Sequence, residues 1–139
     1  MSGGKAFFDT NVLLYMYSTA DTTKQTIAQD LYERYGERNI VLSTQVVQEF
    51  YAAGSRKLGF SPQYLREAIE KFLILPLVLL GPAQIIKAIE NEQQYQISFW
   101  DGLILAAAEA GGADILFTED LNHGQRYGRV LVQNPFLPI

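Results

Sequence analysis

The sequence predicts a single α/β domain with a mainly parallel sheet of five strands that is sandwiched between helices. Five short apolar segments of strand character alternate with segments of helical periodicity, which is typical of a parallel sheet with helical crossovers. The sequence also contains no internal repeat and no linker rich in Pro, Gly or Ser that would divide it. We therefore expect one domain over residues 1–139.

The first half of the chain contains two units in which a strand is followed by helix. Lys5–Phe8 is a short apolar strand candidate, and a helix is expected from Val12 after a polar turn. Apolar residues recur at helical spacing over Thr22–Tyr35, and Gly36 ends this second helix. The β-branched segment Asn39–Ser43 predicts the second strand, and helical periodicity returns after it.

The second half continues the same alternation. A helix begins at Ser61, with proline near its first turn, and Pro76 ends it. Two further helices are expected, one from Gly81 and one rich in Ala and Leu over Phe99–Ala110. The remaining strand candidates are Leu77–Leu80, Ala113–Phe117 and Arg129–Gln133.

Composition and charge limit the classes of function. With 48% hydrophobic and 19% charged residues, the chain has the composition of an ordinary globular protein. The absence of cysteine excludes disulfides, thiolate metal sites and a cysteine nucleophile, and it fits a reducing cytoplasm. The net charge of −4 is opposite to that of a passive nucleic-acid binder. The acidic residues therefore either form a solvated surface or gather around a divalent cation.

No membrane span or targeting signal is apparent in the sequence. The longest apolar stretch, Phe72–Leu80, is interrupted by Pro76 and is much shorter than the roughly 20 residues that cross a bilayer. Met1–Lys5 contains one basic residue, and the apolar run after it is too short for a signal or transit peptide. We expect a cytoplasmic protein that does not associate with a membrane.

Four acidic residues lie where a parallel sheet would form a site. Asp9 and Asp120 directly follow the first and fourth strand candidates. Glu49 lies in the helix after the second strand, and Asp101 lies in the first turn of the Ala-rich helix. Sites in α/β folds form at the carboxyl ends of the strands, so this edge of the sheet could bring the four carboxylates together.

Each of these acids also has an ordinary structural interpretation. Asp9 could cap the helix that follows it, and Asp101 could form a variant capping box with Ser98. Asp120 could form an Asx turn, and Glu49 could be a solvated helix residue. These alternatives remain open for each residue taken alone.

Two of the acids have large apolar neighbours, which favours a site over a solvated surface. Phe50 follows Glu49 and Trp100 precedes Asp101, so both acids are expected near the sheet, where unpaired carboxylates are costly. A hard cation such as Mg²⁺ or Mn²⁺ removes this cost by binding carboxylate oxygens. Because such an ion activates water and stabilises charge on phosphate oxygens, hydrolysis of nucleic acid follows as a hypothesis.

The ordered set of motifs resembles that of the PIN-domain ribonucleases over nearly the whole chain. It is most similar to the single-domain VapC-type toxins of type II toxin–antitoxin pairs, in length, in motif order and in the C-terminal Asn134–Phe136. The resemblance implies an RNA substrate, a homodimer and inhibition by a small antitoxin whose tail enters an acidic groove. The motifs that carry it are Phe8-Asp9-Thr10-Asn11, Glu49, Phe99-Trp100-Asp101 and Phe117-Thr118-Glu119-Asp120.

The resemblance also implies roles for individual residues. The catalytic acids that hold Mg²⁺ or Mn²⁺ would be Asp9, Glu49, Asp101 and Asp120. Residues around them would orient these ligands or add charge, namely Thr10, Asn11, Thr118 and Glu119. Basic residues near the motifs are RNA-binding candidates whose alternative is a solvated surface, namely Arg56, Lys57, Arg126 and Arg129. We interpret His123 as a loop residue, with a metal ligand or an RNA contact as alternatives.

Two other classes of function fit the sequence less well. A catalytically inactive PIN-fold module that only binds RNA or protein would be expected to have lost at least one acid, and all four are present. An α/β hydrolase or nucleotide-binding protein would need a Gly-x-Ser-x-Gly turn, a P-loop or a Gly-x-Gly-x-x-Gly turn, which the sequence lacks. A phosphoacceptor receiver would need a Lys after its last central strand, and no Lys follows Phe117.

Overall fold

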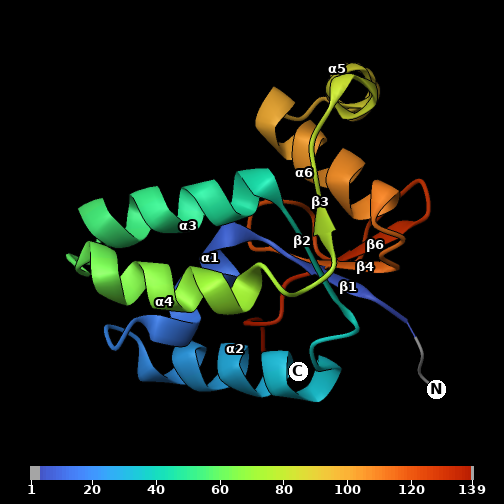
Figure 1. The fold of residues 1–139 in the computed structure, drawn as a ribbon. Coiled ribbons are helices and arrows are strands. Elements are labelled where there is room, and N and C mark those ends of the chain that lie inside the picture. The colour runs from blue at the N-terminus through green and yellow to red at the C-terminus, as the bar shows by residue number, and fades with distance from the viewer. Residues whose placement is uncertain (1–3, 139) are drawn as a thin grey trace.

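The protein is described by a computed structural model that covers residues 4–138, in which six strands form one sheet flanked by six helices (Figure 1). Residues 1–3 lie outside the described residues, so the structure does not describe the start of the Met1–Lys5 segment that was considered as a targeting signal. The strands are β1 (Ala6–Phe8), β2 (Ile40–Ser43), β3 (Leu77–Val78), β4 (Ile115–Phe117), β5 (Arg126–Tyr127) and β6 (Val130–Gln133). The helices are α1 (Thr10–Tyr17), α2 (Thr22–Tyr35), α3 (Thr44–Arg56), α4 (Pro62–Phe72), α5 (Pro82–Tyr95) and α6 (Phe99–Ala110).

The sheet has the order β3-β2-β1-β4-β6-β5, with β1 and β4 at its centre. Every pair from β3 to β6 is parallel, and β5 pairs with β6 in the antiparallel direction. The predicted α/β fold with a mainly parallel sheet is therefore confirmed. The number of strands differs from the prediction, because the described residues form six strands and not five.

The additional strand β5 belongs to a tight hairpin with β6. Tyr127 pairs with Val130, so Gly128 and Arg129 form the turn between the two strands. Gly128 has φ 63°, a conformation that glycine adopts without steric cost. A strand of two residues is too short to give a periodic pattern, which is why the sequence does not reveal it.

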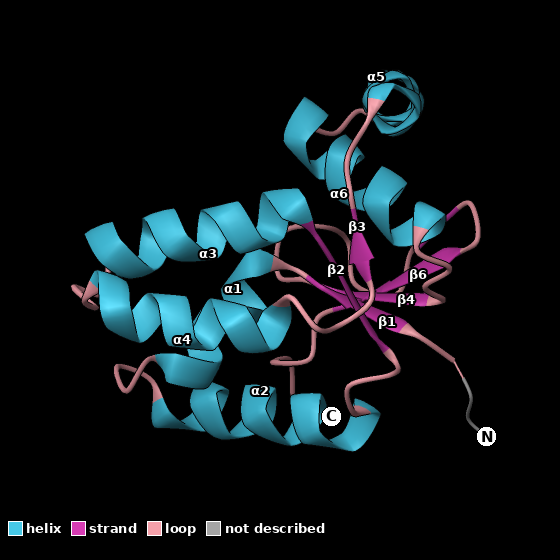
Figure 2. Ribbon diagram, viewed as in Figure 1, coloured by secondary structure: helices cyan, strands magenta, loops and turns pink. Residues whose placement is uncertain are grey.

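Helices cover both faces of the sheet. Helices α1 to α4 gather on one side of it, whereas α6 lies on the other side with α5 outside it (Figure 2). The fully buried Phe8 packs edge-on against Tyr32 and Tyr35 of α2, which holds that helix to the centre of the sheet. On the opposite side, a Cβ on Gly102 would lie 2.6 Å from the backbone oxygen of Ala88, so α5 and α6 approach closely at this glycine.

The parallel strands place several polar residues at one edge of the sheet. Asp9, Ser43 and Thr118 lie at the ends of the neighbouring strands β1, β2 and β4, and all three side chains are buried. Since parallel strands run in the same direction, their carboxyl ends lie together. Between residues 4 and 138, no helix is both long and apolar enough to cross a bilayer.

Candidate active site

Asp9 is the most buried of the four predicted acids. It is 7% exposed, and its carboxylate accepts a hydrogen bond at each oxygen. Oδ1 accepts from the backbone N–H of Thr10 at 2.7 Å, and Oδ2 accepts from the hydroxyl of Thr118 at 2.7 Å. Asp9 is also the N-cap residue of α1, so the ordinary capping interpretation describes part of its role. Its bond to Thr118 joins the ends of β1 and β4.

Burial makes the charged form of Asp9 unfavourable. It raises the pKa of this carboxyl from 3.8 to about 6, although the hydrogen bonds from Thr118 and Thr10 lower it. The nearby carboxylates of Asp120 and Glu49 raise the pKa further. A cation bound nearby would therefore stabilise the ionised form of Asp9.

Glu49 lies on α3 beside Asp9 and is held by two donors. Its Oε1 accepts from the hydroxyl of Thr10 at 2.7 Å, and its Oε2 accepts from the side-chain amide of Gln45 at 3.4 Å. Thr10 therefore orients two acids at once, Asp9 through its backbone N–H and Glu49 through its hydroxyl. Glu49 is exposed, so its expected burial next to Phe50 is wrong; Phe50 alone points into the core.

The other two predicted acids are Asp101, which lies in α6, and Asp120, which lies in the turn after β4. Asp101 is partly buried, and burial raises its pKa, with further contributions from the charges of Asp120 and Glu49. Its backbone N–H donates to the hydroxyl of Ser98 at 3.0 Å, which confirms Ser98 as the helix cap. Asp120 is exposed, and its backbone N–H donates to Thr118 Oγ1 at 3.1 Å. Thr118 therefore forms the turn at this position.

Two adjacent cavities bring the acids together. The first, which we call the acidic cavity, has a volume of about 260 Å³. Its polar and charged lining residues are Asp9, Thr10, Asn11, Glu49, Arg56, Lys57 and Asp120. The second cavity, of about 350 Å³, contains Asp101 and shares Asp120 with the first. Three of the predicted acids thus face one cavity, and Asp101 faces its neighbour.

Several other predicted site residues lie outside these cavities. The carboxylate of Glu119 forms an ion pair with Lys24 at 2.6 Å and does not line either cavity. Arg126 and Arg129 are exposed in the β5–β6 hairpin and also lie outside both linings. His123 accepts a hydrogen bond at Nδ1 from the backbone N–H of Asn134 at 2.9 Å, as expected for a residue that holds a loop.

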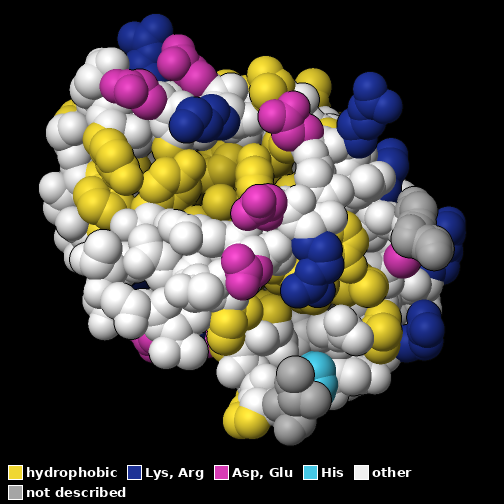
Figure 3. All heavy atoms as spheres, turned by 90° about the horizontal axis from the view of Figure 1, so that it is seen from below, with side chains coloured by type: hydrophobic (Ala, Val, Ile, Leu, Met, Phe, Trp, Pro, Cys, Tyr) yellow, Lys and Arg dark blue, Asp and Glu magenta, His cyan; other side chains and the backbone are white. Residues whose placement is uncertain are grey.

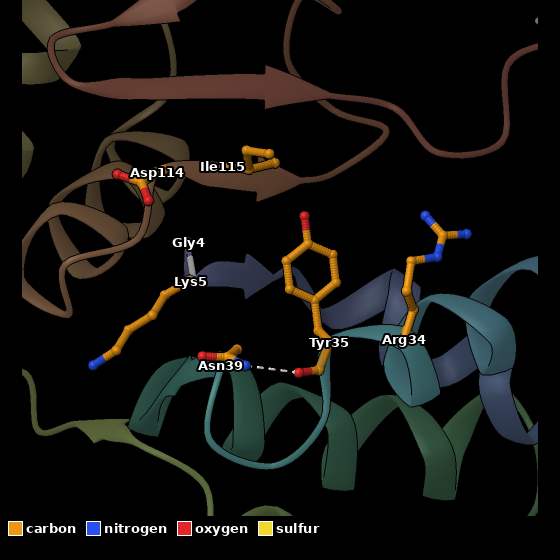
Figure 4. Close-up of a pocket in the computed structure, with 7 residues that line it drawn as sticks. All are labelled: Gly4, Lys5, Arg34, Tyr35, Asn39, Asp114 and Ile115. Carbon is orange, nitrogen blue, oxygen red and sulfur yellow. Dashed lines mark hydrogen bonds between the residues drawn. The ribbon is translucent and has the colours of Figure 1, made fainter. Parts of the chain in front are cut away.

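A further cavity lies away from the predicted site residues. It has a volume of about 460 Å³ and is formed near the amino ends of β1 and β4, with Tyr35 of α2 pointing into it (Figure 4). The side-chain amide of Asn39 donates to the backbone oxygen of Tyr35 at 3.0 Å on one wall. None of the predicted site residues lines this cavity, and parallel sheets place their sites at the opposite edge.

Basic side chains near the acidic cavity are few. Figure 3 shows the side of the molecule on which α2 lies, where Lys and Arg occur in separate groups among Asp and Glu beside a continuous hydrophobic patch. Arg56 and Lys57 are the predicted basic residues that line the acidic cavity itself. They are therefore better placed than Arg126 and Arg129 to meet a substrate bound there.

The chemistry of the acidic cavity suits a hard divalent cation. Its acids supply carboxylate oxygens, and the buried Gln45 beside Glu49 has a side-chain oxygen without a hydrogen-bond partner. The spacing of the acids is wider than a coordination sphere, because no group of three His, Asp or Glu side chains within residues 4–138 is close enough to hold an ion. Binding would require these side chains to rotate toward one another. Gln45 was not predicted, although its position four residues before Glu49 places both on one helix face.

The fold and the arrangement of acids define a class of protein. The family model of the PIN domain matches residues 6–128, and the chain belongs to this family. A comparison with curated protein sequences gave no significant match.

Solved structures of three proteins show the same fold at low sequence identity. A toxin–antitoxin complex from Klebsiella pneumoniae matches with a TM-score of 0.72 and 21% identity over 95% of this chain and 98% of that chain. Mycobacterium tuberculosis VapC20, described as a toxin that cleaves the sarcin-ricin loop, matches with a TM-score of 0.68 and 16% identity over 84% and 90%. DNA-bound VapBC from Salmonella typhimurium matches with a TM-score of 0.65 and 14% identity over 96% and 99%.

Proposed function

We propose that residues 1–139 act as one metal-dependent endoribonuclease domain that hydrolyses RNA phosphodiester bonds. The observation that carries this proposal is the buried Asp9, whose raised pKa and two acidic neighbours favour binding of a cation. Membership of the PIN domain family supports it independently. In the proposed reaction water attacks the phosphodiester directly, without a covalent intermediate.

The four acids would hold Mg²⁺ or Mn²⁺. When bound, such an ion supplies charge that activates water and stabilises the phosphate oxygens. Asp9, Glu49 and Asp120 would bind it from the acidic cavity, and Asp101 would approach from the neighbouring cavity. Thr10 keeps Asp9 and Glu49 in a fixed relative orientation through its two hydrogen bonds, at 2.7 Å each.

The substrate would be held by basic groups at the rim of the acidic cavity. Arg56 and Lys57 lie at the end of α3, about two turns beyond Glu49, and line the same cavity. Their positive charges would bind backbone phosphates and offset the repulsion between RNA and the acids. Asn11 also lines this cavity and would contact either Asp9 or the substrate.

We further propose that the nuclease is the toxin of a toxin–antitoxin pair and acts in the cytoplasm. Structural neighbours that were solved as toxin–antitoxin complexes support a small antitoxin as partner. A homodimer is supported by apolar residues on the outer face of α5, where Ile85, Ile86 and Ile89 are 40–58% exposed, together with Trp100 at 62%. Sedimentation of the purified protein would test the dimer.

The test of the nuclease uses purified protein and a pool of structured RNA that includes ribosomal RNA and tRNA. Wild type would be incubated with Mg²⁺ or Mn²⁺ and with EDTA, and fragments would be read on a sequencing gel. Asp9→Asn is the decisive variant, and Asp30→Asn, the same change at an exposed position of α2, is its control. We expect cleavage that requires metal and disappears only in Asp9→Asn. Cleavage that persists in Asp9→Asn would reject the assignment.

The alternative is a PIN-fold module that binds RNA or protein without catalysis. It would bind RNA in a mobility-shift assay without cleaving it, and Asp9→Asn would leave this binding unchanged. The intact set of four acids favours the enzyme, because a binding module has no need for a buried carboxylate with a raised pKa.

A further inference from the structure

Glu119 belongs to a compact cluster in the turn after β4 and does not line the acidic cavity. Its Oε2 forms an ion pair with the ammonium group of Lys24 at 2.6 Å, and its Oε1 accepts from the hydroxyl of Tyr15 at 2.9 Å. Lys24 also donates to the hydroxyl of Tyr15 at 3.2 Å. Both oxygens of the carboxylate are therefore held by residues from two different helices, α1 and α2.

Aromatic rings cover the cluster. The ammonium nitrogen of Lys24 lies 4.7 Å from the ring centroid of Tyr15 and 5.3 Å from that of Phe136. These two rings pack edge to face with their centroids 5.0 Å apart. We call the set Tyr15, Lys24, Glu119 and Phe136 the Glu119 cluster. The side chains of Lys24 and Glu119 are only 30% and 20% exposed, so their geometry is more restricted than that of a surface ion pair.

The position of Glu119 in the chain connects this cluster to the acidic cavity. It is the residue between Thr118, which holds Asp9, and Asp120, which lines both cavities. A fixed side chain at the middle residue limits the rotation of the whole turn. The hydroxyl of Thr118 and the carboxylate of Asp120 are then presented to the acidic cavity in one orientation.

We propose that Lys24 is a positioning residue for this site: by holding Glu119 outward, together with Tyr15, it sets Thr118 and Asp120 toward the acidic cavity. The proposal rests on the proposed function, because the turn matters only if Asp120 binds the metal. Lys24 itself lines neither cavity and touches no predicted ligand.

The direction in which Mn²⁺ affinity changes in a Lys24 variant distinguishes a positioning role of Lys24 from a direct effect of its charge. Lys24→Met removes a positive charge close to a site that binds a cation, while keeping a long side chain against the two rings. If charge alone mattered, Mn²⁺ would bind more tightly to this variant. If Lys24 acts by positioning, Mn²⁺ would bind more weakly, because loss of a residue that orients a ligand costs about 10-fold or more in metal affinity.

The experiment measures Mn²⁺ affinity without RNA, from the signal of free Mn²⁺ in electron paramagnetic resonance. Lys71→Met, which removes the same charge from an exposed position of α4, is the matched control. We expect about 10-fold weaker binding for Lys24→Met and no change for Lys71→Met. The variant Glu119→Gln should also bind more weakly, and the double variant should bind no more weakly than the weaker single one. Unchanged or tighter binding by Lys24→Met would overturn the proposal.

A second readout keeps this test separate from that of the nuclease. Amide hydrogen exchange at residues 118–120 should be faster in Lys24→Met than in wild type or Lys71→Met, and equal rates would overturn the proposal. If wild type binds Mn²⁺ and cleaves no RNA, the proposed function fails while the Mn²⁺ affinities still decide the role of Lys24. If wild type binds no Mn²⁺, the metal site fails and the exchange rates decide whether Lys24 holds the turn.

Discussion

The metal-free protein should lose stability as the pH rises through the pKa of Asp9. The pKa of this carboxyl is about 6 in the folded protein against 3.8 ordinarily, so between these values the folded state keeps a proton that the unfolded state has released. Stability falls with pH wherever the folded state binds more protons. At about 1.4 kcal/mol per pKa unit, ionised Asp9 costs the folded protein about 3 kcal/mol above pH 6.

Asp9→Asn removes this dependence, because the amide does not ionise. The amide cannot reproduce both hydrogen bonds of the carboxylate to Thr10 and Thr118, and losing one costs about 1 kcal/mol at every pH. Part of the cost of ionising Asp9 is already present at pH 4, so we expect the variant to be about 0.5 kcal/mol less stable than wild type at pH 4 and about 2 kcal/mol more stable at pH 8. The crossing of the two curves distinguishes this mechanism from a purely structural capping role.

The assay is denaturant unfolding followed by circular dichroism in EDTA, from pH 4 to pH 8. The exposed Asp30→Asn variant controls for general loss of an acid and should follow the wild-type curve. Parallel curves for wild type and Asp9→Asn would refute the reasoning, since they would mean that Asp9 has the same pKa in both states. A variant that is less stable at all pH values would assign Asp9 to helix capping alone.

Three further predictions concern single side chains. Thr118→Val, which removes the hydroxyl that joins Asp9 to the turn, should lower Mn²⁺ affinity in electron paramagnetic resonance by about 10- to 100-fold. Arg56→Ala should weaken RNA binding and reduce its salt slope by about 1 in a filter-binding titration, whereas Arg129→Ala, outside both cavities, should leave the slope unchanged. Gly102→Ala should destabilise the protein by about 1–3 kcal/mol in thermal unfolding, because its Cβ would lie 2.6 Å from the Ala88 oxygen; unchanged stability would mean that α5 moves freely away from α6.

The sequence predicts the features that depend on local order along the chain. Alternating strands and helices indicate the parallel sheet, and this topology places Asp9 and Asp120 at the carboxyl ends of β1 and β4. Thr118 was singled out through the resemblance to PIN-domain ribonucleases, and its hydroxyl lies 2.7 Å from Asp9. These positions follow from the parallel direction of the strands. The alternation of strand and helix patterns along the sequence indicates that direction.

Features that depend on contacts between distant residues were not predicted. Glu119 was expected to add charge to the metal site, yet it pairs with Lys24, which is 95 residues earlier in the chain. Nothing in the local sequence of either residue indicates this pair, because it depends on how α2 packs beside the β4 turn. The exposure of Glu49 was missed for a similar reason, since the apolar neighbour Phe50 lies on a different face of α3.

The cost of ionising Asp9 implies that metal binding and folding are coupled. Binding of an ion at about 100 times its dissociation constant stabilises the folded state by about 2.7 kcal/mol, which is close to the cost of about 3 kcal/mol derived for ionised Asp9. Mn²⁺ should therefore raise the melting temperature of wild type at pH 8 and have little effect at pH 5, where Asp9 keeps its proton. It should have less effect on Asp9→Asn at either pH, because that variant has lost a ligand. Equal Mn²⁺ effects on wild type at pH 5 and pH 8 would show that binding of the ion does not depend on the ionised carboxylate of Asp9.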